Sequence, residues 1–389
     1  MSTLARLREW TPSAPLLLSE SSLRRLAELG RLVDVRPAAG GRWIVSPKGV
    51  VGRLELHEGT LELLPKYPVA NLCRMLAAAS ELPRLLEPVT TLGEGALPDL
   101  LVAAFVSRAE ALVAAGLRRD YVEHHERLAA LRGRLDLPVH LRRPEALVTE
   151  LSCRHEEYTF DTLFNGVLRQ TTEICRSRSP ALAVRLSQLR HRLASLPLSR
   201  LRPPEIAQFR YDRFTEPYRP VHALCRLILE GTALGLGDGA APGASFVVEM
   251  APLFERFVSA SLRARLGPPW RVSLQERTSL DTAAVIEIRP DIVVYRDDQA
   301  MAVIDAKYKL RRGGAPASDD AFQALAYARR YGVQRAMLVF PDRPAGIQEH
   351  LTHDRANAIA TQGLDLGAPW SEVEGALDRL AETIRAPAG

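Results

Sequence analysis

The sequence predicts an α/β protein of the multidomain α+β kind, with a central mixed sheet flanked by helices near its C-terminal end. Length is the first observation, because 389 residues are enough for two or three domains. The second is periodicity: short alternating or continuous apolar segments lie near both ends, and helically spaced ones lie between them. The third is a glycine-rich segment at 235–243, which indicates a boundary. We therefore predict a small β-rich N-terminal domain at 1–95, a mainly helical middle domain at 96–240 and a C-terminal domain at 241–389.

The composition is that of an ordinary globular protein, with 47% hydrophobic and 25% charged residues. The best apolar run, 100–116, contains Arg108 and Glu110, so we expect no membrane span. The N-terminus shows no signal-peptide pattern and the four cysteines are widely spaced, which together predict a reducing, cytoplasmic location. A net charge of +5 permits nucleic-acid binding without requiring it. The arginines crowded between 118 and 192 fit a phosphate-binding surface and solvated helix faces equally well.

In the first domain, the pattern predicts one helix, three strands and the start of a second helix. Ser19 is a good N-cap and Gly30 a good stop for the first helix. Glu58-Gly59 is a hairpin signal between two alternating segments. Asn71 is the expected N-cap of the second helix. The predicted elements are a helix at 19–29, strands at 42–46, 50–57 and 60–64, and a helix at 71–80.

The middle and C-terminal domains differ in their periodicity. Helical spacing predicts helices in the middle domain, with an extended segment at 132–136. The predicted middle helices are 100–115, 121–133, 160–177, 181–196 and 218–234. The C-terminal domain is predicted to contain helices at 250–266, 319–331 and 371–384 and strands at 272–277, 285–295, 300–306, 335–340 and 364–366.

Lysine is scarce in this chain, which points to a candidate site. Only four of the 51 basic residues are lysine, and two of them, Lys307 and Lys309, follow an apolar strand. An antiparallel hairpin folded about Asp298 places Asp291 opposite Asp305, or one residue off if the loop is four residues long. Asp305 and Lys307 are two residues apart and share a strand face. These three side chains are therefore expected to converge.

Two close carboxylates suit Mg²⁺, with Mn²⁺ as a second option, because such hard cations bind a few carboxylates, water and substrate phosphate. Asp291 and Asp305 are the predicted metal ligands, and the carbonyl of Ala306 could add a third. A metal held there would activate water for attack on a phosphodiester, with Lys307 orienting the water or stabilising the transition state. The alternative interpretation is a structural ion pair between Lys307 and one of the two aspartates.

Three further residues are candidates for the same site. Glu255 lies on the helix before the strands, where it could reach a metal through water or be an ordinary solvated side chain. Gln323 and Tyr327 are four residues apart on one face of the predicted helix 319–331. They could steady the site or a phosphate, or they could be helix–sheet packing contacts.

The motifs Arg289-Pro-Asp291, Ile304-Asp-Ala-Lys-Tyr-Lys309 and Gln323-Ala-Leu-Ala-Tyr327 resemble those of the PD-(D/E)xK nuclease superfamily. More narrowly, the chain resembles McrC, the nuclease subunit of the McrBC modification-dependent restriction system. The resemblance covers roughly 50–370. It includes segments similar to that family's other motifs: Gly52 to Lys66, Leu131 to Asp136, Glu157 to Asn165 and Met250 to Val258.

The resemblance implies a PD-(D/E)xK restriction-endonuclease-like C-terminal domain in a Mg²⁺-dependent DNA endonuclease that defends against phage and other foreign DNA. Asp291 and Asp305 would be metal ligands and Lys307 the catalytic lysine. It also implies that the chain docks on an McrB-like AAA+ GTPase hexamer, through 1–95, and stimulates its GTPase. The chain contains no G-x-x-x-x-G-K-[ST] loop, so it is not itself the motor. A double-strand break from one centre per chain would need dimerisation or two events.

Two alternative functions remain open at this point. The chain could be a non-catalytic activator or assembly factor of an AAA+ motor. It could also be a stand-alone structure-specific nuclease.

Overall fold

The computed structural model describes residues 3–82, 85–86, 96–142, 149–176, 179–235, 245–309, 311, 315–343, 346–353 and 357–386. The chain forms two compact units: unit 1 combines Met1–Pro98 with Leu234–Gly389, and unit 2 is Asp99–Ala233. The predicted N-terminal and C-terminal domains thus share one unit, and the three-domain division stays a prediction. Most of the glycine-rich segment predicted at 235–243 lies outside the described residues. No helix among the described residues is long and apolar enough to cross a membrane.

The first sheet of unit 1 contains strands from both segments of the chain that form this unit, in the order β1-β5-β4-β9. The first two strands are parallel, and the other neighbours are antiparallel. Gly52 permits the last pairing, because it has a φ of +135° and a Cβ there would collide with the carbonyl oxygen of Phe246. The strands are β1 Thr3–Arg8, β4 Val50–Leu56, β5 Gly59–Leu64 and β9 Phe246–Glu249.

Most of the N-terminal elements match the prediction. The helix expected at 19–29 is α1, whose N-cap Ser19 accepts a hydrogen bond from the backbone N–H of Ser22. The strands expected at 42–46, 50–57 and 60–64 are also present. The remaining elements here are α1 Glu20–Glu28, β2 Val33–Ala38, β3 Arg42–Pro47 and α2 Val69–Ala79.

Two details of this region correct the prediction. Asn71 is not a helix N-cap, because α2 already begins after Pro68. Its buried amide instead donates to the carbonyl oxygens of Leu366 and Ala368, both 2.9 Å away, and so ties α2 to the C-terminal part of unit 1. The hairpin turn lies one residue earlier than expected, because Leu56 pairs with Gly59.

The second sheet of unit 1 has six strands in the order β10-β13-β14-β15-β17-β16. It is mixed, because β14, β15 and β17 run parallel while the other neighbours are antiparallel. The strands are β10 Trp270–Leu274, β13 Ile292–Arg296, β14 Gln299–Ala306, β15 Arg335–Phe340, β16 Ile347–Leu351 and β17 Ala358–Gly363. A separate pair consists of β11 Thr278–Ser279 and β12 Glu287–Ile288.

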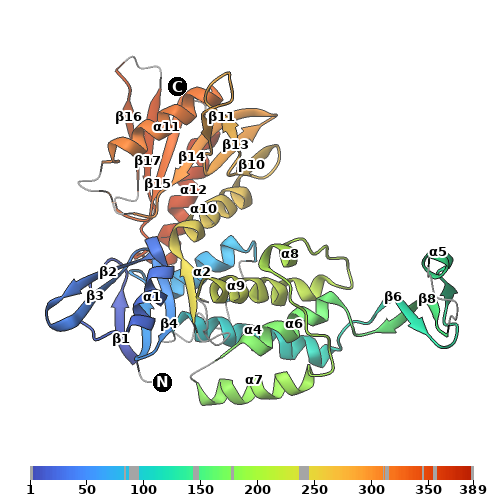
Figure 1. Ribbon diagram of the computed structural model, residues 1–389. Coiled ribbons are helices and arrows are strands. Elements are labelled where there is room, and N and C mark those ends of the chain that lie inside the picture. Colours follow the sequence, from blue (N-terminus) through green and yellow to red (C-terminus); the bar gives the residue numbers. More distant parts are fainter. Residues whose placement is uncertain are drawn as a thin grey trace. The chain divides into compact units, whose positions relative to one another are not determined.

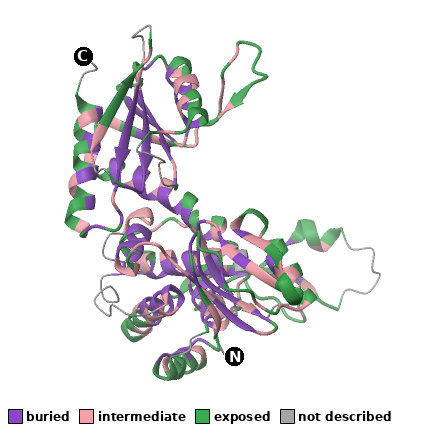
Figure 2. Ribbon diagram, turned by 90° about the vertical axis from the view of Figure 1, so that its left-hand side faces the viewer, coloured by how far each residue is buried: buried purple, intermediate pink, exposed green. Residues whose placement is uncertain are grey.

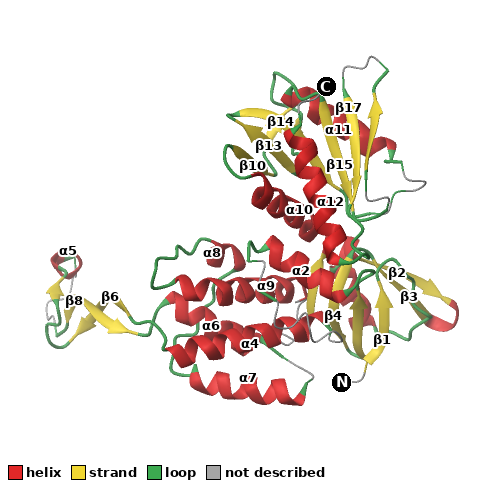
Figure 3. Cartoon of the chain, turned by 180° about the vertical axis from the view of Figure 1, so that it is seen from behind, coloured by secondary structure: helices red, strands yellow, loops and turns green. Residues whose placement is uncertain are grey.

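Helices cover both faces of this sheet, with α11 on one face and α10 and α12 on the other (Figures 1 and 3). The central strands are therefore buried on both sides (Figure 2), which explains why β14 and β15 are almost continuously apolar. The predicted α/β class, with a mixed sheet flanked by helices, is confirmed. The three helices are α10 Met250–Leu266, α11 Ser318–Tyr331 and α12 Trp370–Arg385.

Two strand predictions in this part were wrong. The segment 285–295 is not one strand but divides into β12 and β13 at Pro290, whose missing N–H cannot join a ladder. The segment 364–366 is not a strand, although Leu364 and Leu366 are fully buried. These two leucines pack in the core, but β17 ends at Gly363, so they are no longer part of the sheet.

Unit 2 is a group of helices with a β-hairpin arm that projects from them (Figure 1). The arm is the three-stranded sheet β6-β8-β7 with the short helix α5 at its tip. Its strands and helix are β6 Asp120–Leu128, β7 Arg134–Leu135, β8 Leu151–Thr159 and α5 Leu137–Leu141. The other helices are α4 Leu97–Ala115, which begins just before the unit boundary, α6 Leu163–Ile174, α7 Pro180–Arg192, α8 Pro203–Ala207 and α9 Arg219–Gly235, which ends just after it.

The helix predicted at 121–133 was wrong, because this segment is strand β6. All nine residues of β6 pair with β8, so the cross-strand ladder overrides the helical pattern. The extended segment expected at 132–136 is confirmed in part by β7. The four other middle helices are confirmed as α4, α6, α7 and α9.

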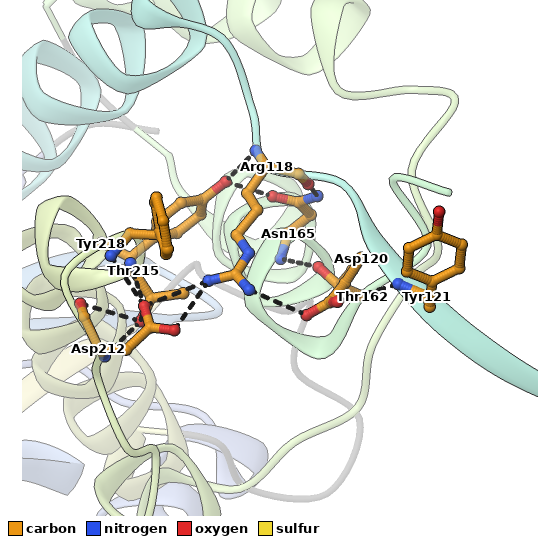
Figure 4. Close-up of polar contacts among 9 residues, drawn as sticks. Arg118, Asp120, Tyr121, Thr162, Asn165, Asp212, Thr215 and Tyr218 are labelled. Atoms are coloured by element: carbon orange, nitrogen blue, oxygen red, sulfur yellow. Dashed lines mark hydrogen bonds and ion pairs between the residues drawn. The ribbon is translucent and has the colours of Figure 1, made fainter. Parts of the chain in front are cut away.

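A polar network holds the base of the arm against the helices of unit 2 (Figure 4). The buried amide of Asn165 donates to the carbonyl oxygens of Arg118 and Phe160, and its own oxygen accepts from the Tyr218 hydroxyl at 2.7 Å. Arg118 also pairs with Asp212 at 3.2 Å. The arm therefore leaves the unit from a defined position.

Candidate active site

A tight turn and a bulge together set the register of the hairpin β13–β14. Asp297 and Asp298 both have positive φ, +49° and +63°, as in a type I′ turn. Between Val294 and Tyr295 the register shifts by one residue, which leaves Met301 unpaired as a bulge in β14. Beyond it Ile292 faces Ile304, so the next two residues outward are Asp291 and Asp305.

The structure brings together the two aspartates that the sequence predicts. Asp305 is the penultimate residue of β14 and only 2% exposed. Asp291 lies directly before β13, and its Oδ2 accepts a hydrogen bond from the backbone N–H of Ala306 at 2.8 Å. The sheet therefore places both aspartates at the end where its central strands stop, and it also binds the carboxylate of Asp291.

Lys307 and Gln323 complete one side of this cluster. The Lys307 ammonium forms an ion pair with Asp305 and donates to Oε1 of Gln323 at 2.9 Å. Nε2 of Gln323 in turn donates to the hydroxyl of Tyr327 at 2.7 Å, and that hydroxyl donates to the Arg289 carbonyl at 3.2 Å. This chain of hydrogen bonds links α11 to the residues before β13 and orients the ammonium group of Lys307.

Glu255 of α10 lies close enough to the aspartates to affect their charge. Burial raises the pKa of Glu255, and the charge of Asp305 adds to this, against a hydrogen bond from Gln275 and the charge of Arg289. Burial also raises the pKa of Asp291, to about 8, together with the charge of Asp305, a hydrogen bond with it and the charge of Glu255. Three acidic groups thus repel one another in a partly buried place.

Lys307 partly offsets this concentration of negative charge. Burial by itself would lower its pKa, but the charge of Asp305, their hydrogen bond and the charges of Asp291 and Asp320 raise it overall. The ammonium form is therefore favoured at neutral pH. A protonated lysine beside clustered carboxylates can hold an anionic substrate group that the carboxylates alone would repel.

The carboxylates of Asp291 and Asp305 suit a divalent cation whose other ligands are water or substrate oxygens. Within the described parts of the chain there is no group of three or more His, Cys, Asp or Glu side chains arranged to hold a metal. Burial and the charge of Asp305 raise the pKa of the Asp291 carboxyl, and a cation bound beside the two aspartates would oppose both effects. Mg²⁺ fits such a place, because it usually keeps several waters and binds proteins through one or two carboxylates. Asp291 and Asp305 would hold it, with the carbonyl of Ala306 beside them.

Sequence reasoning missed one polar residue near the end of these central strands. Asp320 is only 6% exposed and pairs with Lys309 at 2.7 Å. It lies three residues before Gln323 and seven before Tyr327, so all three share a face of α11. This helical spacing could have identified Asp320 as a third polar residue on that face.

The fold is that of a mixed α/β protein, with acidic and basic residues clustered where the strands β13 and β14 of its six-stranded sheet meet their common end. A family model described as "McrBC 5-methylcytosine restriction system component" matches residues 45–341, which is more than half of the chain. The chain therefore belongs to the McrBC restriction-system component family. A comparison with curated proteins gave no match.

Two solved structures of McrBC assemblies each contain a chain that matches this one. One is a chain of the half-complex from a tetradecameric assembly of Thermococcus gammatolerans McrB AAA+ hexamers with bound McrC. It is 20% identical, with a TM-score of 0.63, and the match covers 98% of this chain and 99% of that one. The other is a chain of the Thermococcus gammatolerans McrBC complex, 19% identical with a TM-score of 0.46, covering 68% of this chain and 88% of that one. At 20% identity the likeness to the first of these chains shows the fold.

Proposed function

We propose that this chain is the Mg²⁺-dependent DNA endonuclease subunit of an McrBC-like restriction system, and that its centre is of the PD-(D/E)xK type. The observation that carries the proposal is the convergence of Asp291, Asp305 and Lys307 at the end of β13 and β14. Membership of the McrBC family gives this centre a matching context, since a restriction system must break DNA. Defence against phage and other foreign DNA is the corresponding biological role.

In the proposed mechanism each residue has a separate task. Asp291 and Asp305 would hold the cation, which when bound would supply charge stabilisation and an activated water. Lys307 keeps its proton and contacts the non-bridging oxygens of the scissile phosphate, where negative charge builds up in the transition state. Gln323 holds the Lys307 ammonium in place through its 2.9 Å hydrogen bond. Glu255, which interacts electrostatically with both aspartates, would add negative charge that favours cation binding.

The proposed partner is an McrB-like AAA+ GTPase hexamer, whose GTP hydrolysis this chain would stimulate. Two observations support this partner. The chain has no phosphate-binding loop of its own, and a chain of similar fold occurs in an assembly of McrB AAA+ hexamers with bound McrC. Segment 1–95 remains one candidate docking region. The arm of unit 2 is another, because its exposed apolar side chains include Tyr121, Tyr158 and Leu141.

The proposed nuclease is tested by cleavage of modified DNA with the partner, GTP and Mg²⁺ present. Asp305→Ala and Lys307→Ala should each lower the cleavage rate by at least about 100-fold, because the first removes a proposed metal ligand and the second removes the positive charge at the reacting phosphate. Lys48→Ala is the matched control, since Lys48 is 41% exposed and pairs only loosely, at 3.8 Å, with Asp34. Full cleavage by either site variant would overturn the assignment of the site.

The same proteins distinguish the nuclease from a pure activator of the motor. If the chain has both roles, Asp305→Ala loses cleavage and still stimulates GTP hydrolysis by the partner fully. An activator without nuclease activity would show GTPase stimulation and no cleavage even in the wild type. Cleavage of branched DNA by the isolated chain would instead favour a stand-alone nuclease. Two copies are expected at each double-strand break, because each chain has one such centre.

A further inference from the structure

The two lysines of the candidate site flank a short turn that has Tyr308 at its centre. The Lys307 N–H still donates to the Val339 carbonyl at 2.8 Å, which continues the pairing of β14 with β15. The Lys309 N–H then donates to the Lys307 carbonyl at 2.8 Å, a bond that spans two residues as in a γ-turn. Tyr308 therefore determines where both lysine side chains leave the backbone.

Tyr308 lies on the opposite side from the lysines and is anchored there. It is only 6% exposed, and its ring packs against Phe254 of α10 and Tyr67, at centroid distances of 5.9 and 6.4 Å. Its hydroxyl donates to Oε2 of Glu9 at 3.2 Å. Glu9 follows β1 and Tyr67 follows β5, so the N-terminal sheet supplies part of this anchor.

Lys66 also contacts Tyr308, through its ammonium group and the aromatic ring. Its Nζ lies 4.3 Å from the ring centroid of Tyr308 and 5.0 Å from that of Tyr67. Nζ is buried and has no hydrogen-bond partner among the described residues. The neighbouring carboxylates of Glu9 and Asp342 attract the ammonium, while burial lowers its pKa. Its main direct contacts are therefore with the two aromatic rings, an arrangement whose attraction grows as water is excluded.

This environment explains why the position holds lysine in a chain that uses arginine almost everywhere else. An arginine would bring a wide, planar group with five N–H donors into a space where even the ammonium finds no acceptor among the described residues. Unsatisfied buried donors are costly. A compact ammonium on a flexible stem fits against both rings.

We propose that Lys66 is a positioning residue for the catalytic lysine. By holding the ring of Tyr308, it sets the turn 307–309 and hence the place of the Lys307 ammonium. The catalytic consequence rests on the proposed function, whereas the structural coupling between Lys66 and Lys307 does not. A movement of the N-terminal sheet would reach the site by the same contacts.

The scarcity of lysine provides a direct test of the coupling. Full-length protein labelled with ¹³C at lysine Cε gives one NMR signal for each of four lysines. Lys66→Arg and Lys66→Met should each shift the signals of Lys307 and Lys309 and leave that of Lys48 in place. Lys48→Arg is the matched control and should shift neither. A Lys307 signal that stays at its wild-type position in the Lys66 variants would overturn the proposal. If Lys66→Arg fails to fold, Lys66→Met decides, because it keeps the stem and adds no donor.

Cleavage by the full complex tests the consequence for the reaction. In Lys66→Met the rate at saturating Mg²⁺ should fall by about 10- to 100-fold, because small misplacements of a catalytic group are costly. The Mg²⁺ concentration for half-maximal rate should not change, since Asp291 and Asp305 lie on the sheet itself. A changed Mg²⁺ requirement with an unchanged maximal rate would contradict the positioning role. If the wild-type complex does not cleave DNA, the proposed function fails while the NMR result still judges the coupling.

Discussion

His222 shows how one buried residue can make the stability of unit 2 depend on pH. It lies in α9 with 1% of its surface exposed. Its Nε2–H donates to the Phe164 carbonyl at 3.0 Å, and Nδ1 accepts from the Tyr211 hydroxyl at 3.1 Å. Burial lowers the pKa of His222 to about 4, although the bond to Phe164 opposes this. The folded protein therefore keeps this histidine neutral.

The sign of the pH effect follows from the lowered pKa. Between about pH 6.5 and 4 the unfolded chain binds a proton at His222 that the folded chain does not. The stability that His222 contributes is therefore complete above pH 6.5 and decreases as the pH falls. In urea unfolding, His222→Gln should reduce the pH slope of the unfolding free energy in this range by about 1 kcal/mol per pH unit. His191→Gln, at an exposed position, is the control, and equal slopes in both variants would contradict the prediction.

At the scale of elements, the arm of unit 2 depends on Gly133, a glycine at the bend before β7. Gly133 has a φ of +69°, and a Cβ there would overlap the carbonyl oxygen of Arg154 and the side chain of His155. The bend lets β7 pair with β8, where Arg134 faces Arg154 and Leu135 faces Cys153. A small sheet on the surface has few other contacts to compensate for the loss of this pairing.

Gly133→Ala should therefore disrupt the arm while the helices of unit 2 stay folded. We expect a loss of about 1–3 kcal/mol from the positive φ together with the collision. Protection of the arm's backbone amides from hydrogen exchange is the suitable measurement. Gly116→Ala is a matched control, because Gly116 also has a positive φ, +95°, but nothing lies within 4 Å of its Cβ position. Equal exchange in the two variants would show that the collision is unimportant.

At the scale of the whole molecule, the first and last parts of the chain form one folded body. β9 completes the N-terminal sheet by pairing with β4, and Val50 and Val247 on these strands are fully buried. Asn71 joins α2 to the segment before α12. Separating the parts would expose a strand edge and this apolar surface.

Fragments 1–98 and 234–389 should therefore each be insoluble or unfolded when expressed alone. Co-expression of the two should yield a soluble pair, and replacement of 99–233 by a flexible linker should preserve unit 1. Far-ultraviolet circular dichroism and size-exclusion chromatography would measure these outcomes. A soluble, cooperatively unfolding fragment 234–389 would show that the C-terminal sheet does not need the N-terminal one.

Sequence alone predicted the central residues of the candidate site because Asp291, Asp305 and Lys307 lie close together in the chain. Asp291 and Asp305 lie on one hairpin, and the alternation of strand residues places Lys307 on the same side as Asp305. The prediction that the hairpin folds about Asp298 gave the right register for a reason that the sequence did not show. The two-residue turn shifts the pairing by one residue, and the bulge at Met301 shifts it back. Gln323, Tyr327 and Asp320 were within reach of helical spacing, although Asp320 was overlooked.

The sequence by itself determined the α/β class, most helices, the central hairpin and the candidate acids with their lysine, because each follows from short-range periodicity. Only the tertiary structure decided that β9 joins β4, that β6 is a strand of an arm and that Lys66 lies against Tyr308. These contacts join residues far apart in the chain, and no local pattern encodes which distant partner will cover an apolar or charged side chain. Cross-strand pairing and burial make that choice when the whole chain packs.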